Sequence, residues 1–124
     1  MALGEYPKAI VFLQAATRLN PGDAGAQKML ATAAFQNNDM VLAANACEAT
    51  VRLAPSDADA QLGLAKALFA LNRLPSAAAA CRAVVASPSS SLAQRQAARQ
   101  ILERITLADQ KHKTETTFSI ISAG

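Results

Sequence analysis

Few side chains in this 124-residue sequence have the types and spacings that enzymes use. His112 is the only histidine, and neither cysteine lies near it in the chain. There is no Gly-rich phosphate-binding motif, and no Cys or His residues stand at the spacing of a metal site. Single Ser and Asp residues fall at expected turns and helix starts, where their hydroxyl and carboxylate groups serve as caps. We therefore predict no catalytic activity, no metal and no cofactor.

A period of 34 residues organises the first 88 residues of the chain. Matching positions occur in eight sets at this interval: Ala9, Ala43 and Ala77; Leu13, Cys47 and Cys81; Pro21 and Pro55; Asp23 and Asp57; Ala24 and Ala58; Gln27 and Gln61; Leu30 and Leu64; and Phe35 and Phe69. Self-similarity at a fixed period of this length is typical of a helical solenoid. In each repeat the proline ends one helix, and the aspartate two residues later caps the next.

Two segments carry a resemblance to a known family. The residues GEYPKAI at 4–10 and ATRLNP at 16–21 resemble the second helix of the tetratricopeptide repeat (TPR), with its Gly, aromatic, Ala pattern and its Leu-x-Pro exit. The resemblance covers about residues 4–88. It implies an all-α fold, an α-solenoid of antiparallel helix pairs, and a concave surface, lined by the first helix of each pair, that holds peptides.

The period predicts about two and a half repeats followed by a capping helix. The TPR array spans 1–88, with a half repeat at 4–23 and full repeats at 24–57 and 58–88. The expected helices span about 6–19, 23–36, 40–53, 57–71, 75–86 and 92–111. The capping region at 89–111 has an apolar stripe on one side and Gln and Arg on the others, as the terminal helix of a solenoid requires. The segment 112–124 is predicted to be a separate apolar tail, because 116–121 is β-prone and lacks helical spacing.

The resemblance also nominates a binding surface. The residues expected to face a peptide are Lys28, Thr32, Phe35, Gln36, Asp59, Leu62, Lys66 and Phe69. Phe35 and Phe69 either pack within their repeats or present an aromatic pair to the partner. Lys28 and Lys66 either contact a carboxylate of the partner or remain solvated. A chaperone-type carboxylate clamp is not expected, because Thr32 and Lys66 stand where the clamp has Asn.

The half repeat leaves an unfinished edge. The first helix lacks the helix that should precede it, so Ile10, Phe12 and Leu13 lose part of their cover. Either the chain is a fragment of a longer array, or another molecule covers this edge. The tail residues Phe118, Ile120 and Ile121 supply such a cover within the chain, or between copies in a homo-oligomer.

Charge and composition limit the classes of partner that we expect for this chain. The net charge is +3, with seven basic and six acidic residues in 1–88 and five and three in the remainder, so no clustered basic face for nucleic acid is expected. Cys47 and Cys81 occupy equivalent positions in adjacent repeats, about 8–10 Å apart, which is too far for a disulfide. No apolar run approaches the ~20 residues that span a membrane. No signal peptide precedes the first helix, so a cytoplasmic location is the default expectation, unless the natural N-terminus has been trimmed.

These observations lead to one main functional hypothesis and two alternatives. The main hypothesis is a non-catalytic TPR scaffold that binds a protein or peptide through its concave helix-A face. The first alternative is a self-assembling module whose N-terminal edge or C-terminal tail forms homo-oligomer contacts. The second is a small bacterial secretion-type chaperone, which only the size of the chain suggests.

Overall fold

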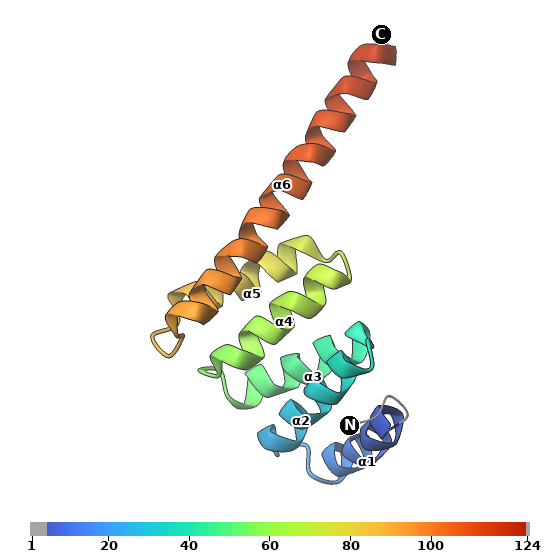
Figure 1. Cartoon of the computed structure of the whole chain (residues 1–124), viewed down its shortest axis with the longest axis vertical. Coiled ribbons are helices and arrows are strands. Elements are labelled where there is room, and N and C mark those ends of the chain that lie inside the picture. Colours follow the sequence, from blue (N-terminus) through green and yellow to red (C-terminus); the bar gives the residue numbers. More distant parts are fainter. Residues whose placement is uncertain (1–4, 124) are drawn as a thin grey trace.

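The computed structural model describes residues 5–123, with side chains described for 6–111. This part of the chain contains α-helices and no strand: α1 (Glu5–Leu19), α2 (Ala24–Gln36), α3 (Met40–Leu53), α4 (Ala58–Ala70), α5 (Leu74–Ala86) and α6 (Leu92–Ala123). Each helix packs on the next in chain order, and α6 also packs on α4 (Figure 1). The predicted all-α solenoid is therefore confirmed.

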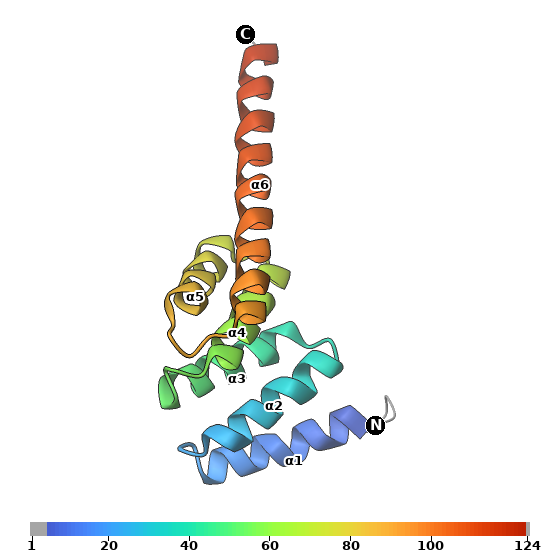
Figure 2. The ribbon, with the colours of Figure 1, turned by 60° about the vertical axis from the view of Figure 1, so that its left-hand side comes forward.

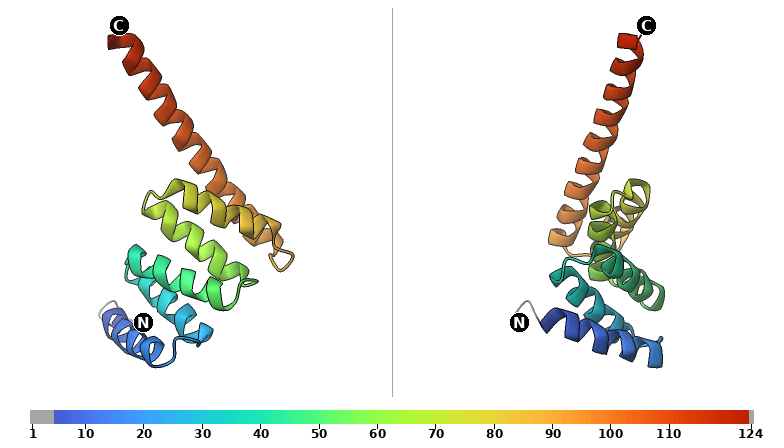
Figure 3. Two further views of the ribbon diagram at one scale, coloured as in Figure 1. Left: turned by 180° about the vertical axis from the view of Figure 1, so that it is seen from behind. Right: turned by 90° about the vertical axis from the view of Figure 1, so that its right-hand side faces the viewer.

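The helices form antiparallel pairs that stack into a curved array. α2 pairs with α3 and α4 with α5, while α1 lies against α2 at one end (Figure 2). Views from behind and from the side show the same succession, with α6 leaving the array at the opposite end (Figure 3). This arrangement places α2, α4 and α6 as successive first helices, 34 residues apart in the sequence.

Side-chain caps mark the start of four of the described helices, α2, α3, α4 and α6. Asp23, Asp39 and Asp57 are N-caps, and each carboxylate accepts a hydrogen bond of 3.1 Å from the backbone N–H three residues later. At the start of α6, Ser91 and Gln94 form a reciprocal capping box, with hydrogen bonds of 2.7 and 3.1 Å.

The turn inside each repeat depends on an asparagine. Asn38 and Asn72 stand one period apart and have left-handed backbone angles, with φ of 56° and 60°. Asparagine tolerates this conformation better than most other residues with a side chain. The residue after each asparagine donates its N–H to the carbonyl five positions back, Ala34 for one turn and Leu68 for the other. These bonds reverse the chain tightly between the two helices of a pair.

Alanine dominates the core. Ala34, Ala43, Ala65, Ala67 and Ala77 are fully buried, which allows neighbouring helices to approach closely. The buried residues form two clusters: a smaller one in α1, α2 and α3, and a larger one that runs from Ala34 of α2 through α3, α4 and α5 to α6. Phe35 packs against both clusters and thereby connects the two halves of the array.

The prediction of a separate tail at 112–124 is wrong. α6 continues as one helix to Ala123 and projects beyond the array (Figure 1). β-propensity depends strongly on neighbouring strands, and no strand lies in the described residues to pair with this segment. Extending an existing helix adds one hydrogen bond for each residue fixed, without a new nucleation cost. The predicted end at Lys111 therefore lies inside α6.

Candidate functional site

One face of the array, lined by α2, α4 and α6, carries most of the residues that the sequence nominates; we call it the A face. Polar and aromatic side chains stand at helical spacing on it, such as Lys28, Thr32 and Phe35 of α2 and Asp59 and Lys66 of α4. Three pockets open along or beside this face, and each lies between neighbouring helices.

The central pocket lies between α2, α3 and α4 and measures about 280 Å³. Its lining is Lys28, Ala31, Thr32, Phe35, Cys47, Thr50, Asp59, Ala60 and Gly63. A Cβ atom at Gly63 would lie 3.0 Å from the Cys47 Sγ and 3.6 Å from the Phe35 Cε2. Gly63 therefore provides the room in which the phenylalanine ring packs against α4.

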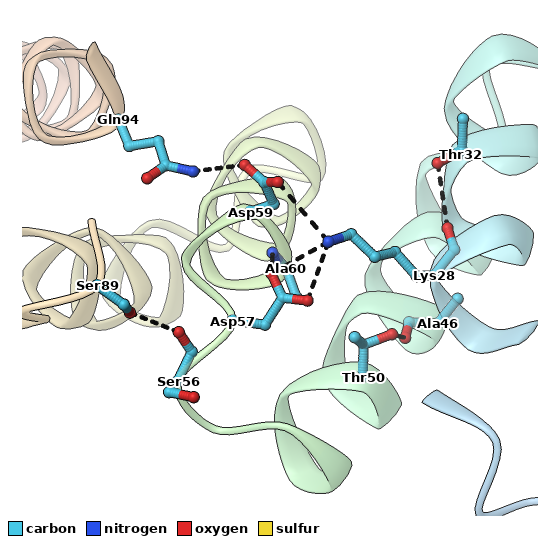
Figure 4. A network of polar contacts seen from close by, with 10 residues as sticks. All are labelled: Lys28, Thr32, Ala46, Thr50, Ser56, Asp57, Asp59, Ala60, Ser89 and Gln94. Atoms are coloured by element: carbon cyan, nitrogen blue, oxygen red, sulfur yellow. Dashed lines mark hydrogen bonds and ion pairs between the residues drawn. The ribbon is translucent and has the colours of Figure 1, made fainter. Parts of the chain in front are cut away.

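An ion-pair network closes one side of the central pocket (Figure 4). The Lys28 Nζ lies 3.0 Å from the Asp57 Oδ2 and 3.7 Å from the Asp59 Oδ2. The Gln94 Nε2 of α6 donates a hydrogen bond to the Asp59 Oδ1. The network thus connects α2, α4 and α6 on the A face, and it already satisfies the charge of Lys28 with two carboxylates.

The pKa values reflect this pairing. The hydrogen bond to Asp57 raises the pKa of Lys28, against the opposing effect of burial. Burial alone would raise the pKa of Asp57, but hydrogen bonds from Lys28 and from the Ala60 N–H outweigh it and lower that pKa. Both groups therefore stay charged over a wider pH range than free side chains would.

Cys47 lines the central pocket and carries a protonated thiol near neutral pH. Burial, with a smaller contribution from the charge of Asp57, raises the pKa of its thiol to about 11. Cys47 and Cys81 are both free and buried, as expected for small apolar residues of the core. Within the described residues, no group of three or more His, Cys, Asp or Glu side chains is placed to hold a metal ion.

A second pocket of about 400 Å³ lies between α4 and α6. It is lined by Lys66, Phe69, Ala97, Gln100, Ile101 and Arg104. Phe69 and Ile101 form an apolar floor, while Lys66 and Arg104 are exposed. The lining contains no acidic side chain, and neither cation forms an ion pair with any described residue.

A third pocket of about 290 Å³ lies between α1 and α2 and is mainly apolar. Its lining is Tyr6, Ala9, Leu13, Met29, Thr32, Ala33 and Gln36. Met29 is 61% exposed, so a large apolar side chain is open to a partner here. Thr32 lines both this pocket and the central one, so the two adjoin.

Seven of the eight nominated binding residues line one of these pockets, and Leu62 does not. Leu62 is 8% exposed and belongs to the same buried cluster as Ala98 and Ile101 of α6. Its expected place on the binding surface is wrong, because α6 packs against α4 and buries this position. Phe35 and Phe69 are only partly buried, so each ring both packs in the core and lines a pocket.

The nominated oligomer edge is also divided by the structure. Ile10 is buried and Leu13 lines the α1–α2 pocket, so neither faces outward, contrary to expectation. Phe12 is 76% exposed, together with Val11 and Leu19, which the sequence analysis did not single out. The side chains of Phe118, Ile120 and Ile121 lie outside the described residues.

The period itself could have found the functional residues that sequence reasoning missed. Arg104 lies two periods after Gln36, and Gln100 lies one period after Lys66 and two periods after Thr32. All of these residues line pockets. α6 therefore continues the pattern of first helices, although it was expected to act only as a cap.

Comparisons with known proteins agree with this architecture. A family model described as tetratricopeptide repeat matches residues 1–58 and, in a second, overlapping match, residues 42–91. The first TPR of Spaghetti (RPAP3), solved bound to the HSP90 peptide SRMEEVD, aligns with a TM-score of 0.70 at 22% identity. The alignment covers 83% of this chain and 82% of that one, and at this identity it shows a shared fold. None of the curated proteins compared with the chain matches it.

The stacked helix pairs place the molecule in the class of α-solenoids. The two family matches together cover well over half of the sequence. The chain belongs to the tetratricopeptide-repeat family. Members of this family generally serve as non-catalytic protein-interaction modules. No helix in the described part of the chain contains a stretch long and apolar enough to cross a membrane.

Proposed function

We propose that the chain is a non-catalytic scaffold that binds a peptide, or an extended segment of a protein, along its A face. The observation that carries this proposal is the series of three pockets, two of which share Thr32 and two of which are lined by α4. Concave, mainly apolar sites with a few polar groups are the usual form of a ligand site. The TPR domain of Spaghetti, which shares the fold, was solved with a peptide bound.

The proposed mechanism is preorganisation. The partly buried rings of Phe35 and Phe69 are held by core contacts, so they offer aromatic surface with little loss of side-chain freedom on binding. Thr32 and Gln36 are exposed and can hydrogen-bond a peptide backbone. Lys28 pairs chiefly with Asp57 and at a longer distance with Asp59, so its role is to fix the spacing of α2 and α4.

The test is a selection of peptides from a display library on the immobilised chain, followed by affinity measurements on variants. T32R places a long side chain between two pockets and is expected to abolish binding of the selected peptides. E48R introduces the same residue at an exposed site on α3 that lines none of the three pockets, and is the matched control. Equal binding by T32R and wild type would show that the A face is not the binding surface.

A second candidate function is self-assembly through the outer face of α1. Phe12 is 76% exposed, whereas Ala46 and Ala80, one and two periods later, are 2% and 9% exposed. Those equivalents are buried because a helix precedes α3 and α5, so the outer face of α1 has the position of a helix interface. We infer that a second copy of the chain covers it.

Sedimentation velocity of F12D and wild type tests this assembly. F12D is expected to shift a dimer to a monomer, while V41D is the control, because Val41 is an exposed apolar residue of α3. The chain without residues 112–124 tests whether the projecting end of α6 takes part. A wild-type chain that sediments as a monomer at high concentration would end this candidate.

A further inference from the structure

From the distribution of charge along the binding face, we infer the chemical class of the ligand and the placement of two of its side chains: a peptide with an apolar side chain at the α1–α2 pocket and a carboxylate at the α4–α6 pocket. This inference rests on the proposed function, because it assumes that the A face binds a peptide. It adds which residues of the peptide are selected and which pocket each of them occupies.

The two lysines of the A face differ in whether their charge is already paired within the protein. Lys28 and Lys66 both stand on first helices, but their surroundings differ. Lys28 lies within 3.0 Å of Asp57 and 3.7 Å of Asp59, so its charge is neutralised within the protein. Lys66 has no ion pair among the described residues and lines a pocket without an acidic group. Positive charge therefore remains available at the α4–α6 pocket and not at the central one.

Lys66 shares the α4–α6 pocket with a second cation. Arg104 of α6 lines the same pocket, so two cations from different helices border one space of about 400 Å³. Gln100 adds an amide to the same lining, and Phe69 and Ile101 supply its apolar part. An ionised carboxylate can accept charge-assisted hydrogen bonds from both cations, and the guanidinium can bind it through two N–H groups.

The pocket at the opposite end of the A face has a different chemical character. The α1–α2 pocket is lined by Tyr6, Leu13 and Met29 and has no charged group in its lining. It therefore favours an apolar side chain and disfavours a carboxylate, which would lose its hydration there. The two end pockets thus select opposite kinds of group.

The spacing of the helices sets the length of the peptide. Neighbouring packed helices lie about 8–10 Å apart, so the two end pockets are separated by roughly 20 Å. An extended chain rises about 3.3 Å for each residue. The apolar residue and the acidic residue are therefore expected about six positions apart.

The experiment compares peptides selected from a random display library on the wild-type chain and on K66E/R104E. The wild type is expected to enrich Asp or Glu about six positions from an apolar residue, and the variant to enrich Lys or Arg there instead. R52E/R99E is the matched control: it has the same net charge, and its changes lie at exposed sites outside the α4–α6 pocket. A synthetic peptide from the wild-type selection should bind K66E/R104E at least about tenfold more weakly than the control.

The placement of the apolar residue is tested with the same synthetic peptide. M29D is expected to reduce its binding and to reduce enrichment of the apolar residue without altering selection for the acid, because Met29 lines only the far pocket. A single-stranded oligonucleotide of equal charge is expected to bind much more weakly. Equal binding would reveal a general attraction for anions and would overturn the inference.

The possible failures are distinguishable. Enriched peptides without acidic residues, or equal binding to K66E/R104E and R52E/R99E, would overturn the inference and leave the proposed function standing. A library that yields no enriched peptide on the wild-type chain would overturn both. Circular dichroism of every variant checks that the helices are intact.

Discussion

The Lys28 Nζ lies 3.0 Å from the carboxylate of Asp57, a residue 29 positions later that also caps α4. One carboxylate thus performs two tasks, starting a helix and holding the neighbouring repeat. The lysine is 46% exposed and the aspartate 22%, so solvent screens the ion pair considerably. Its main consequence is geometric, because it fixes α2 against α4 beside the central pocket.

Replacing Asp57 is expected to cost more stability than replacing Asp23. Both residues are N-caps with equivalent 3.1 Å hydrogen bonds, so D57A and D23A each lose about 0.5–2 kcal/mol of helix capping. D57A additionally loses the contact with Lys28, worth about 0.2–1 kcal/mol for a pair this exposed. Urea unfolding of D57A, D23A and each combination with K28A measures the difference. If K28A costs as much in the D57A background as in wild type, the two residues are not coupled.

The same pair predicts a dependence of stability on pH. The folded-state pKa of Asp57 lies below its unfolded value, which is about 3.9. The unfolded chain therefore binds the proton more readily. The stabilisation is complete above the unfolded pKa and is lost as the pH falls through the folded pKa.

D57N keeps a side chain that can cap α4 but cannot ionise. Its free energy of unfolding is expected to fall less than that of wild type between about pH 5 and pH 2. K28Q should show part of the same reduction, since Lys28 helps to lower the pKa of Asp57. Parallel pH curves for wild type and D57N would contradict this origin of the acid sensitivity.

The sequence predicted the solenoid because its evidence is periodic. Helix limits, caps and the exposed positions Thr32 and Lys66 repeat at 34 residues, and a local rule places them correctly. The pairing of Lys28 with Asp57 was not predictable, because spacing does not reveal which charges meet across repeats. Leu62 and Lys28 occupy equivalent positions in adjacent repeats, but Leu62 is buried in a cluster with residues of α6, whereas Lys28 is 46% exposed. The same position in the repeat is therefore buried in one case and exposed in the other. The continuation of α6 past Lys111 was not predictable from composition, which does not show that the β-prone residues at 116–121 have no strand to pair with in the described part of the chain.

The close approach at Gly63 predicts a second stability effect. In G63A the new methyl group would lie 3.0 Å from the Cys47 Sγ and 3.6 Å from the Phe35 Cε2. Cys47 is buried, and Phe35 packs against both core clusters. Alanine improves helix propensity by about 1 kcal/mol, but overpacking in a tight core costs about 1–3 kcal/mol. We expect a net loss of stability of about 1 kcal/mol.

Three further variants establish the cause of that loss: G22A, C47A and C47A/G63A. G22A is the control, because a Cβ at Gly22 would meet the Asn20 Oδ1 at 3.8 Å, an ordinary contact. In the C47A background the sulfur is gone, so adding G63A should become neutral or stabilising. Thermal unfolding of G63A, G22A, C47A and C47A/G63A gives the effect of G63A on stability with and without the sulfur. If G63A destabilises the C47A background as much as it destabilises the wild type, the close contact responsible is the one with the Phe35 ring.

The thiols of Cys47 and Cys81 are expected to resist alkylation in the folded chain. Burial leaves Cys47 4% exposed and raises its thiol pKa to about 11, whereas a free cysteine has a pKa near 8.5. At pH 8 the thiolate fraction of Cys47 is then smaller by roughly two orders of magnitude, and access is restricted as well. Iodoacetamide labelling followed by mass spectrometry is expected to proceed at least about a hundredfold more slowly than with a free thiol, and to accelerate in urea.

Labelling also separates the two cysteines, because only Cys47 lines the central pocket. A peptide bound on the A face should slow the labelling of Cys47 more than that of Cys81, whose burial does not depend on this pocket. Equal protection of both thiols would indicate that the peptide acts by suppressing unfolding of the whole array, since global opening exposes the two residues together. Rapid labelling of Cys47 in the absence of urea would show that the central pocket opens far enough to admit a reagent, contrary to the packing of Phe35 over Gly63.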